Sequence, residues 1–187
     1  FGNDSAKVAA LSQKVLDGLH EENVYGVIKH FPGHGATAGD THEGYAYTDK
    51  SLEELEQQEL VPFQNAIENH IAIIMAGHIS VPNVTGDNTP SSLSKIMITD
   101  VLREKMGFDG IVITDALNMG AISQHYSSAE VSVKVIEGGD MLLMPENFQE
   151  AYQGILEAVQ NGTLTEERID ESVRRILKVK EKLTAED

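Results

Sequence analysis

The 187-residue sequence contains no cysteine, and only 14 of its residues are Lys or Arg, against 30 Asp and Glu. The absence of cysteine excludes disulfide scaffolds, thiolate zinc sites and cysteine nucleophiles, but it is compatible with either redox compartment. The resulting net charge is −16. Such an acidic chain is a poor candidate for binding nucleic acid or anionic membranes, because both rely on Lys and Arg contacting phosphate.

Long hydrophobic runs are also missing. No apolar segment approaches the ~18 residues needed to cross a bilayer, so no membrane span is predicted. The sequence begins at Phe1 and shows no signal-like segment. We therefore expect the natural N-terminus to lie outside it, which leaves both a cytoplasmic and a secreted location open. Apolar residues still make up 41% of the chain, enough for the core of one domain.

Hydrophobic periodicity predicts strands that alternate with helices. The predicted helices cover residues 4–22, 52–69, 92–106, 128–137, 148–160 and 165–183, and the predicted strands cover 24–29, 71–76, 110–114 and 140–144. Ser51 and Ser92 are expected to cap helices, and Gly107 is expected to end one. For the segment 128–137 a strand competes with the helix, because Val131, Val133 and Val135 alternate.

Continuously apolar strands that alternate with helices indicate an α/β fold with a parallel sheet. One possible closure is a small open doubly wound sheet. The other is half of a TIM (β/α)₈ barrel, whose eight units typically take ~250 residues. No linker divides the chain, so residues 1–187 are expected to form a single, partial domain. Either closure places ligands at the carboxyl ends of the strands, where Lys29, His30, His78 and Asp115 are expected.

The densest polar stretch is residues 29–42, most of it in the long loop from His30 to Lys50. Asp40 and His42 are two residues apart in it, so they share a face if the loop is extended. A carboxylate beside an imidazole fixes its tautomer and raises its pKa, which gives an acid/base that works near neutral pH. The competing interpretation is an Asx-turn beside a solvated histidine. Asp115, at a strand end, could be a nucleophile, a metal ligand or a helix cap.

Three histidines in one loop also suggest a metal site. The spacing of His30, His34 and His42 lacks a recognised ligand motif such as His-Glu-x-x-His, so no metal is predicted. The glycine-rich loop contains neither Gly-x₄-Gly-Lys-Ser/Thr nor Gly-x-Gly-x-x-Gly, so it is not a phosphate cradle and no cofactor is predicted.

Several motifs together resemble one known family. The segment Lys29-His30-Phe31-Pro32-Gly33-His34-Gly35, followed by Asp40-Thr41-His42, resembles the signature of the β-N-acetylhexosaminidase branch of glycoside hydrolase family 3. Segments 75–78, 90–94, 107–110, 113–117, 139–143 and 168–177 resemble further family motifs in the same order. The likeness covers nearly the whole chain, and an ordered set of motifs is far more specific than any one of them.

The resemblance implies a retaining glycosidase that removes terminal β-linked N-acetylglucosamine. Asp115 is then the nucleophile that forms a glycosyl-enzyme intermediate. His42, oriented by Asp40, is the general acid/base in place of the second carboxylate that most retaining glycosidases use. Lys29 and His30 are then ligands of the sugar hydroxyls, and His78 is assigned to the same substrate site.

The Asp-x-His loop favours an N-acetylglucosaminidase, because the β-glucosidases of this family generally lack it and take their acid/base from another domain. Some family members resemble phosphorylases, and the sequence leaves phosphorolysis open. Two other functions also stay open: a metal-dependent hydrolase that uses His30, His34, His42 and Asp115, and a half-barrel without catalytic activity.

The family's barrel also contains four earlier strand–helix units that have no counterpart in this sequence. The sequence is therefore expected to be the C-terminal half of the catalytic barrel, with the last four strand–helix units and a closing helix. The expected partners are an N-acetylglucosamine-containing saccharide and either the missing half of the barrel or a second copy of the chain.

Overall fold

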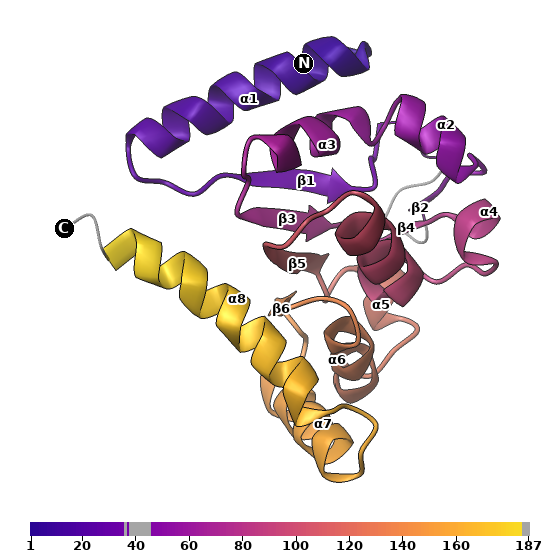
Figure 1. Cartoon of the computed structure of the whole chain (residues 1–187). Coiled ribbons are helices and arrows are strands. Elements are labelled where there is room, and N and C mark those ends of the chain that lie inside the picture. Colours follow the sequence, from indigo (N-terminus) through magenta and orange to yellow (C-terminus); the bar gives the residue numbers. More distant parts are fainter. Residues whose placement is uncertain (36, 38–45, 185–187) are drawn as a thin grey trace.

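In the computed structural model, which describes residues 1–35, 37 and 46–184, strands alternate with helices along the chain (Figure 1). The main strands are β1 (Val27–Phe31), β3 (Ile73–Ala76), β5 (Ile111–Ala116) and β6 (Met141–Leu143). The longer helices are α1 (Ser5–Glu21), α2 (Leu52–Gln57), α3 (Val61–Glu68), the π-helix η2 (Ile96–Lys105), α6 (Ser128–Ile136), α7 (Phe148–Gln160) and α8 (Glu166–Thr184). Shorter elements are β2 (Ala46–Tyr47), β4 (Ile79–Ser80), α4 (Pro82–Thr85), the 3₁₀ turn η1 (Ser91–Leu93) and α5 (Gly120–Ser123).

The main sheet has the strand order β1-β3-β5-β6, and each neighbouring pair is parallel. Each strand thus lies beside the next main strand of the chain. Right-handed crossovers that always step in one direction place their helices on one face of the sheet, as in a barrel. A doubly wound sheet would reverse this order. The predicted α/β fold with parallel strand–helix repeats is therefore confirmed, and the open doubly wound alternative is not supported.

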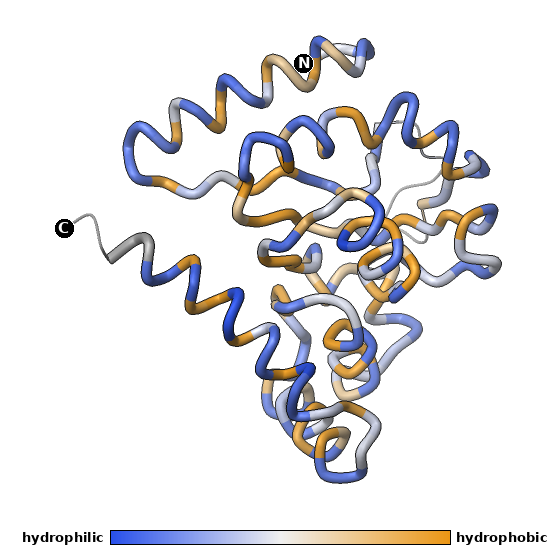
Figure 2. The backbone as a smooth tube through the Cα atoms, viewed as in Figure 1, coloured by the Kyte–Doolittle hydropathy of each residue, from blue (hydrophilic) through white to orange (hydrophobic). Residues whose placement is uncertain are grey.

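The largest hydrophobic core lies between the first three main strands and the helices that cover them. Phe31, Leu55, Ile74, Met97 and Leu102 are fully buried in it. Figure 2 shows hydrophobic residues along these strands, whereas α1 and α8 alternate hydrophobic and hydrophilic residues along their lengths. This pattern is typical of helices with one apolar face.

Several helix predictions are confirmed. The segment 128–136 is helical because Ser127 and Glu130 form a capping box at its start, and Val131 and Val135 face the core. The predicted capping box of Ser51 and Glu54 begins α2. Gly107, expected to end a helix, follows η2 with φ +76°, a left-handed conformation that glycine adopts without strain.

Three predicted elements need correction. The helix expected at 52–69 is broken into α2 and α3, because Pro62 lies in the first turn of α3 and has no N–H to donate to a preceding turn. The strand expected at 24–29 is β1 at Val27–Phe31, so Lys29 and His30 lie within it. Ser92 does not cap a helix; the Ser94 hydroxyl accepts from the Met97 N–H instead, at 3.3 Å.

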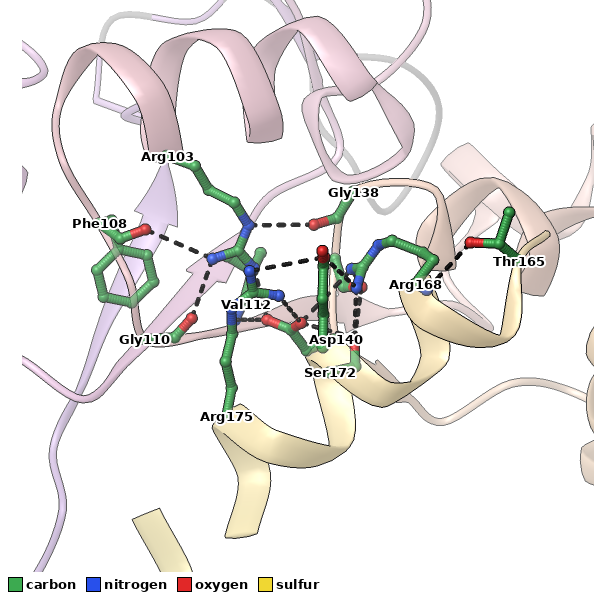
Figure 3. Close-up of polar contacts among 12 residues, drawn as sticks. Arg103, Phe108, Gly110, Val112, Gly138, Asp140, Thr165, Arg168, Ser172 and Arg175 are labelled. Atoms are coloured by element: carbon green, nitrogen blue, oxygen red, sulfur yellow. Dashed lines mark hydrogen bonds and ion pairs between the residues drawn. The ribbon is translucent and has the colours of Figure 1, made fainter. Parts of the chain in front are cut away.

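The long helix α8 is attached to the sheet through Asp140, which immediately precedes β6 (Figure 3). Its Oδ2 accepts from Arg103 of η2 at 2.6 Å and from the Val112 N–H of β5 at 2.9 Å. Its Oδ1 accepts from Ser172 at 2.7 Å and from Arg175 at 3.0 Å, both on α8. The Asp140 side chain is fully buried. One carboxylate thus joins a strand, a crossover helix and the C-terminal helix at the amino end of β6.

The charges around Asp140 keep it ionised. Burial alone would raise the pKa of Asp140, but Arg103, the Val112 N–H, Ser172 and Arg175 together hold it below its ordinary value. Arg168 adds a further ion pair at 3.5 Å and donates to the Gly139 carbonyl at 2.6 Å. The cluster is therefore a structural connection, at the opposite strand end from Asp115.

Candidate active site

Asp115 lies at the carboxyl end of β5, the position predicted for a catalytic carboxylate. Its side chain is 19% exposed. Its Oδ1 accepts from the backbone N–H of Ala116 at 2.8 Å. Its Oδ2 faces His30, whose Nε2 lies 3.5 Å away, too far for a good hydrogen bond. One carboxylate oxygen is thus fixed, and the other is turned toward a second polar side chain.

His30 comes from the neighbouring part of the sheet, two strands away in the order β1-β3-β5. Burial lowers the pKa of His30, and the nearby Asp115 charge only partly offsets this. The ring is therefore neutral at pH 7 and can donate one N–H to an oxygen of a ligand. The His34 ring packs edge-on to it, with the ring centroids 5.9 Å apart.

Two glycines allow the segments around His30 to approach closely. Gly33 has φ +130°, and a Cβ built there would lie 2.7 Å from the Cβ of Glu59. A Cβ at Gly77 would lie 2.9 Å from the Cβ of His30. Larger residues at either position would displace the turn after β1 or the His30 side chain.

A cavity of about 900 Å³ opens beside this region, between the outer edge of β1 and the helix α1. Lys29, His30 and His34 line its polar part, together with the ion pair of Lys50 and Glu59, whose Nζ and Oε1 atoms are 2.6 Å apart. Val15 and Leu16 of α1 line its apolar part. Lys29 is exposed, as expected for a residue that could reach a ligand.

His78, which is predicted to bind the substrate, lies in a different environment from His30 and Asp115. Its side chain is completely buried. Its Nε2 lies 2.9 Å from the Ala116 carbonyl and its Nδ1 lies 2.8 Å from the Ser92 hydroxyl. Both ring nitrogens are therefore occupied by protein groups, and neither can bind a sugar hydroxyl without losing one of these bonds.

The other predicted catalytic residues, Asp40 and His42, lie outside the described residues. Within residues 1–35, 37 and 46–184, no three His, Asp or Glu side chains are grouped so that they could hold a metal ion. In the same part of the chain, no helix is both long and apolar enough to cross a membrane. The structure thus brings His30 and Asp115 close together, whereas His78 is buried and hydrogen-bonded to Ala116, the residue after Asp115.

Two parts of the site were not predicted from sequence. Ser92, assigned to a helix cap, lies against His78 instead. Gly77 provides the space beside His30. No local pattern distinguishes a serine that caps a helix from one that binds a buried imidazole 14 residues away, so Ser92 carried no usable signal.

Comparisons with known proteins place the chain in one family. Residues 1–179 match the model of the glycosyl hydrolase family 3 N-terminal domain. A β-N-acetylglucosaminidase/β-glucosidase of Cellulomonas fimi is 30% identical over 98% of the chain. The structure of a family 3 β-N-acetylglucosaminidase from a Paenibacillus strain superposes with a TM-score of 0.95 at 35% identity over 100% of the chain. A β-glucoside phosphorylase, BglX, superposes with a TM-score of 0.91 at 31% identity over 97% of the chain.

These proteins are considerably longer than the chain. The chain covers 34% of the Cellulomonas protein, 36% of the Paenibacillus protein and 34% of the phosphorylase. It therefore spans about a third of the length of each of them.

Proposed function

Because the chain belongs to glycosyl hydrolase family 3, whose N-terminal domain its residues 1–179 match, we propose that it is the part of a retaining β-N-acetylglucosaminidase that carries the nucleophile. The substrate is a saccharide with a terminal β-linked N-acetylglucosamine. The observation that carries the proposal is Asp115 at the carboxyl end of β5, with one oxygen fixed by the Ala116 N–H and the other facing His30.

The two oxygens of Asp115 suit different tasks. Oδ1 is held by the Ala116 N–H, which fixes the plane of the carboxylate. Oδ2 makes only the long contact with His30 among the described residues, so it is the oxygen that attacks. An anion at this position also stabilises the positive charge that develops at the anomeric carbon in an oxocarbenium-like transition state.

The reaction proceeds in two steps. In the first, Oδ2 of Asp115 bonds to the anomeric carbon while the glycosidic bond breaks, and His42, oriented by Asp40, gives its proton to the departing oxygen. In the second, water attacks the anomeric carbon, its proton passes to His42, and the bond to Asp115 breaks. Two displacements retain the configuration of the sugar. Because histidine is neutral after the first step, it also tolerates an approaching anion.

Lys29 and His30 are proposed to bind the sugar. The neutral His30 ring, partly exposed beside Asp115, can donate to a hydroxyl of the sugar whose anomeric carbon Asp115 attacks. Lys29 is exposed and lines, with His30, the cavity beside β1; Asp115 is not among the residues that line this cavity. N-acetylglucosamine is preferred over glucose in this proposal because the Asp-x-His loop is present and because relatives carry the name β-hexosaminidase.

A second candidate is phosphorolysis, in which phosphate replaces water in the second step. It is supported by the similarity to the β-glucoside phosphorylase and by a histidine acid/base that would not repel an anionic acceptor. The two reactions share the nucleophile and differ only in the acceptor.

One assay tests both candidates. The full-length protein is incubated with aryl β-N-acetylglucosaminide or aryl β-glucoside, with and without phosphate, and the sugar products are identified. We expect N-acetylglucosamine with retained configuration; a sugar 1-phosphate that forms only with phosphate present would favour phosphorolysis. Activity lost with a chelator and restored by a metal ion would favour the metal-dependent alternative. No turnover of either glycoside would contradict the proposal.

A further inference from the structure

Ser92, His78 and Ala116 form a chain of hydrogen bonds that ends at the proposed nucleophile. Nδ1 of His78 lies 2.8 Å from the Ser92 hydroxyl, and Nε2 lies 2.9 Å from the Ala116 carbonyl. The N–H of the same residue, Ala116, donates to Oδ1 of Asp115 at 2.8 Å. Ala116 therefore accepts a hydrogen bond from the His78 imidazole through its carbonyl and donates one to the Asp115 carboxylate through its N–H.

The partners determine how the imidazole is protonated. A carbonyl oxygen can only accept, so Nε2 must carry the proton. Nδ1 is then the acceptor, and the Ser92 hydroxyl donates to it. Burial lowers the pKa of His78, which keeps the ring neutral and preserves this arrangement at pH 7. A single tautomer with both nitrogens bonded leaves the ring one orientation.

Ser92, which hydrogen-bonds to the His78 ring, is itself held in place by the protein. Ser92 is 3% exposed, and its N–H donates to the Gly77 carbonyl at 3.1 Å. The neighbouring Ser91 hydroxyl donates to the Ile79 carbonyl at 2.6 Å. The turn that carries Ser92 is thus attached on both sides of His78 to the segment that follows β3.

From these contacts we propose that His78 is a positioning residue, which, supported by Ser92, holds the end of β5 so that the Asp115 carboxylate points at the anomeric carbon of the substrate. This role rests on the proposed function of Asp115. It replaces the direct sugar contact expected for His78 from the sequence. A side chain that fixes the nucleophile affects the chemical step, whereas a sugar ligand affects substrate binding as well.

Two substitutions of His78 test whether its bond to the Ala116 carbonyl is needed. His78→Gln places an amide NH₂ where Nε2 stood, so it can still donate to the Ala116 carbonyl. His78→Asn is too short to reach that carbonyl. In the full-length protein, we expect His78→Asn to lower kcat about 10- to 100-fold with KM changed less than about threefold, and His78→Gln to recover at least a third of the wild-type kcat.

The serines supply a matched pair in case the His78 variants do not fold. Ser92→Ala removes the hydroxyl that supports the ring, whereas Ser132→Ala removes an equally buried hydroxyl on α6 that donates to the Ala151 carbonyl. Both should lower the thermal midpoint by a similar amount. Only Ser92→Ala should lower kcat, by about 3- to 10-fold, because only it loosens the ring.

The outcomes are distinct. Equal kcat losses in His78→Asn and His78→Gln, or in Ser132→Ala and Ser92→Ala, would overturn the positioning role. A large rise in KM at unchanged kcat would instead restore His78 as a sugar ligand. Failure of the proposed function would be seen separately, as full activity in Asp115→Asn, and it would leave the His78 variants without a nucleophile to position.

Discussion

At the scale of single residues, Asp115 carries the chemical step of the proposed reaction. Asp115→Asn replaces the attacking oxygen by a neutral amide while preserving shape, so the covalent intermediate cannot form. Turnover of an aryl β-N-acetylglucosaminide should fall by at least about 10³-fold. Asp109→Asn is a suitable control, because Asp109 is 87% exposed and pairs only with Lys178 among the described residues. A variant that retains a tenth of the wild-type rate would show that Asp115 is not the nucleophile.

A second prediction tests the acid role of His42. An activated aryl leaving group departs with little help from a proton, whereas an alkyl or sugar leaving group needs one. His42→Ala should therefore impair poor leaving groups far more than activated ones. Asp40→Asn should act in the same direction but more weakly, because it disturbs only the partner of the ring. Equal losses of turnover across a series of leaving groups would show that His42 is not the general acid.

A third prediction concerns stability and pH. Burial lowers the pKa of both His30 and His78, so both are neutral in the folded protein at a pH where they are protonated in the unfolded chain. The unfolded state then binds more protons, and the free energy of unfolding falls as the pH drops below about 6.5, by at most about 1.4 kcal/mol per pH unit for each histidine.

Denaturant titrations between pH 5 and 8 measure this dependence. His78→Gln should flatten it, because the unfolded chain then has one histidine fewer to protonate. An unchanged slope in His78→Gln would mean that His78 binds protons equally in the folded and the unfolded state, so that burial does not lower its pKa.

At the scale of helices and strands, the connection through Asp140 should be the most sensitive. Asp140→Ala would leave Arg103 buried without its carboxylate, which costs about 3–5 kcal/mol when one partner of a buried ion pair is removed. Breaking the exposed pair of Arg174 and Asp170 with Asp170→Ala should cost about 0.5 kcal/mol or less, because water screens it. Urea unfolding of both variants checks the contrast. Similar losses in the two would show that the Asp140 cluster does not hold α8 to the sheet.

The order of strands and helices could be predicted because local sequence patterns determine it. The apolar run from Ile71 to Ala76 is typical of a buried strand and contains β3, and capping boxes mark the starts of α2 and α6. The break between α2 and α3 was also accessible, since Pro62 interrupts the helical segment. What the patterns do not contain are the short strands β2 and β4 within the loops, which form only by pairing with each other.

The site was predicted only in part, for the same reason. Its residues were found because strands of a parallel sheet bring their carboxyl ends together, which predicts that His30 and Asp115 are neighbours. The burial of His78 could not be foreseen, because a histidine after a strand looks the same whether its partners are sugar hydroxyls or the carbonyl of Ala116, 38 residues away. Only the packing of β3 against β5 determines which is present.

At the scale of the whole molecule, both outer edges of the main sheet, β1 and β6, are unpaired among the described residues. Among the described strands, β1 pairs only with β3 and β6 only with β5. Large apolar side chains lie on or near these elements, including Val27 at 39% exposure, Met144 at 57% and Phe148 at 67%. Open parallel edges beside exposed apolar residues are sites for further pairing. We propose that strands outside residues 1–187 cover them in the full-length protein and complete a barrel.

The last prediction follows from these edges. A polypeptide of residues 1–187 alone should self-associate, because pairing buries apolar surface worth roughly 25 cal/mol per Å². It should also be inactive on aryl β-N-acetylglucosaminides, because half of the wall around the sugar would be missing. Sedimentation velocity and a glycoside assay test both expectations. Val27→Lys, which puts a charge on the β1 edge, should weaken the association without unfolding the chain, since edge lysines oppose strand pairing. Adding the remainder of the full-length protein as a second polypeptide should restore activity. An active monomer of residues 1–187 would contradict the half-barrel, because it would need neither edge covered to hold a sugar against Asp115.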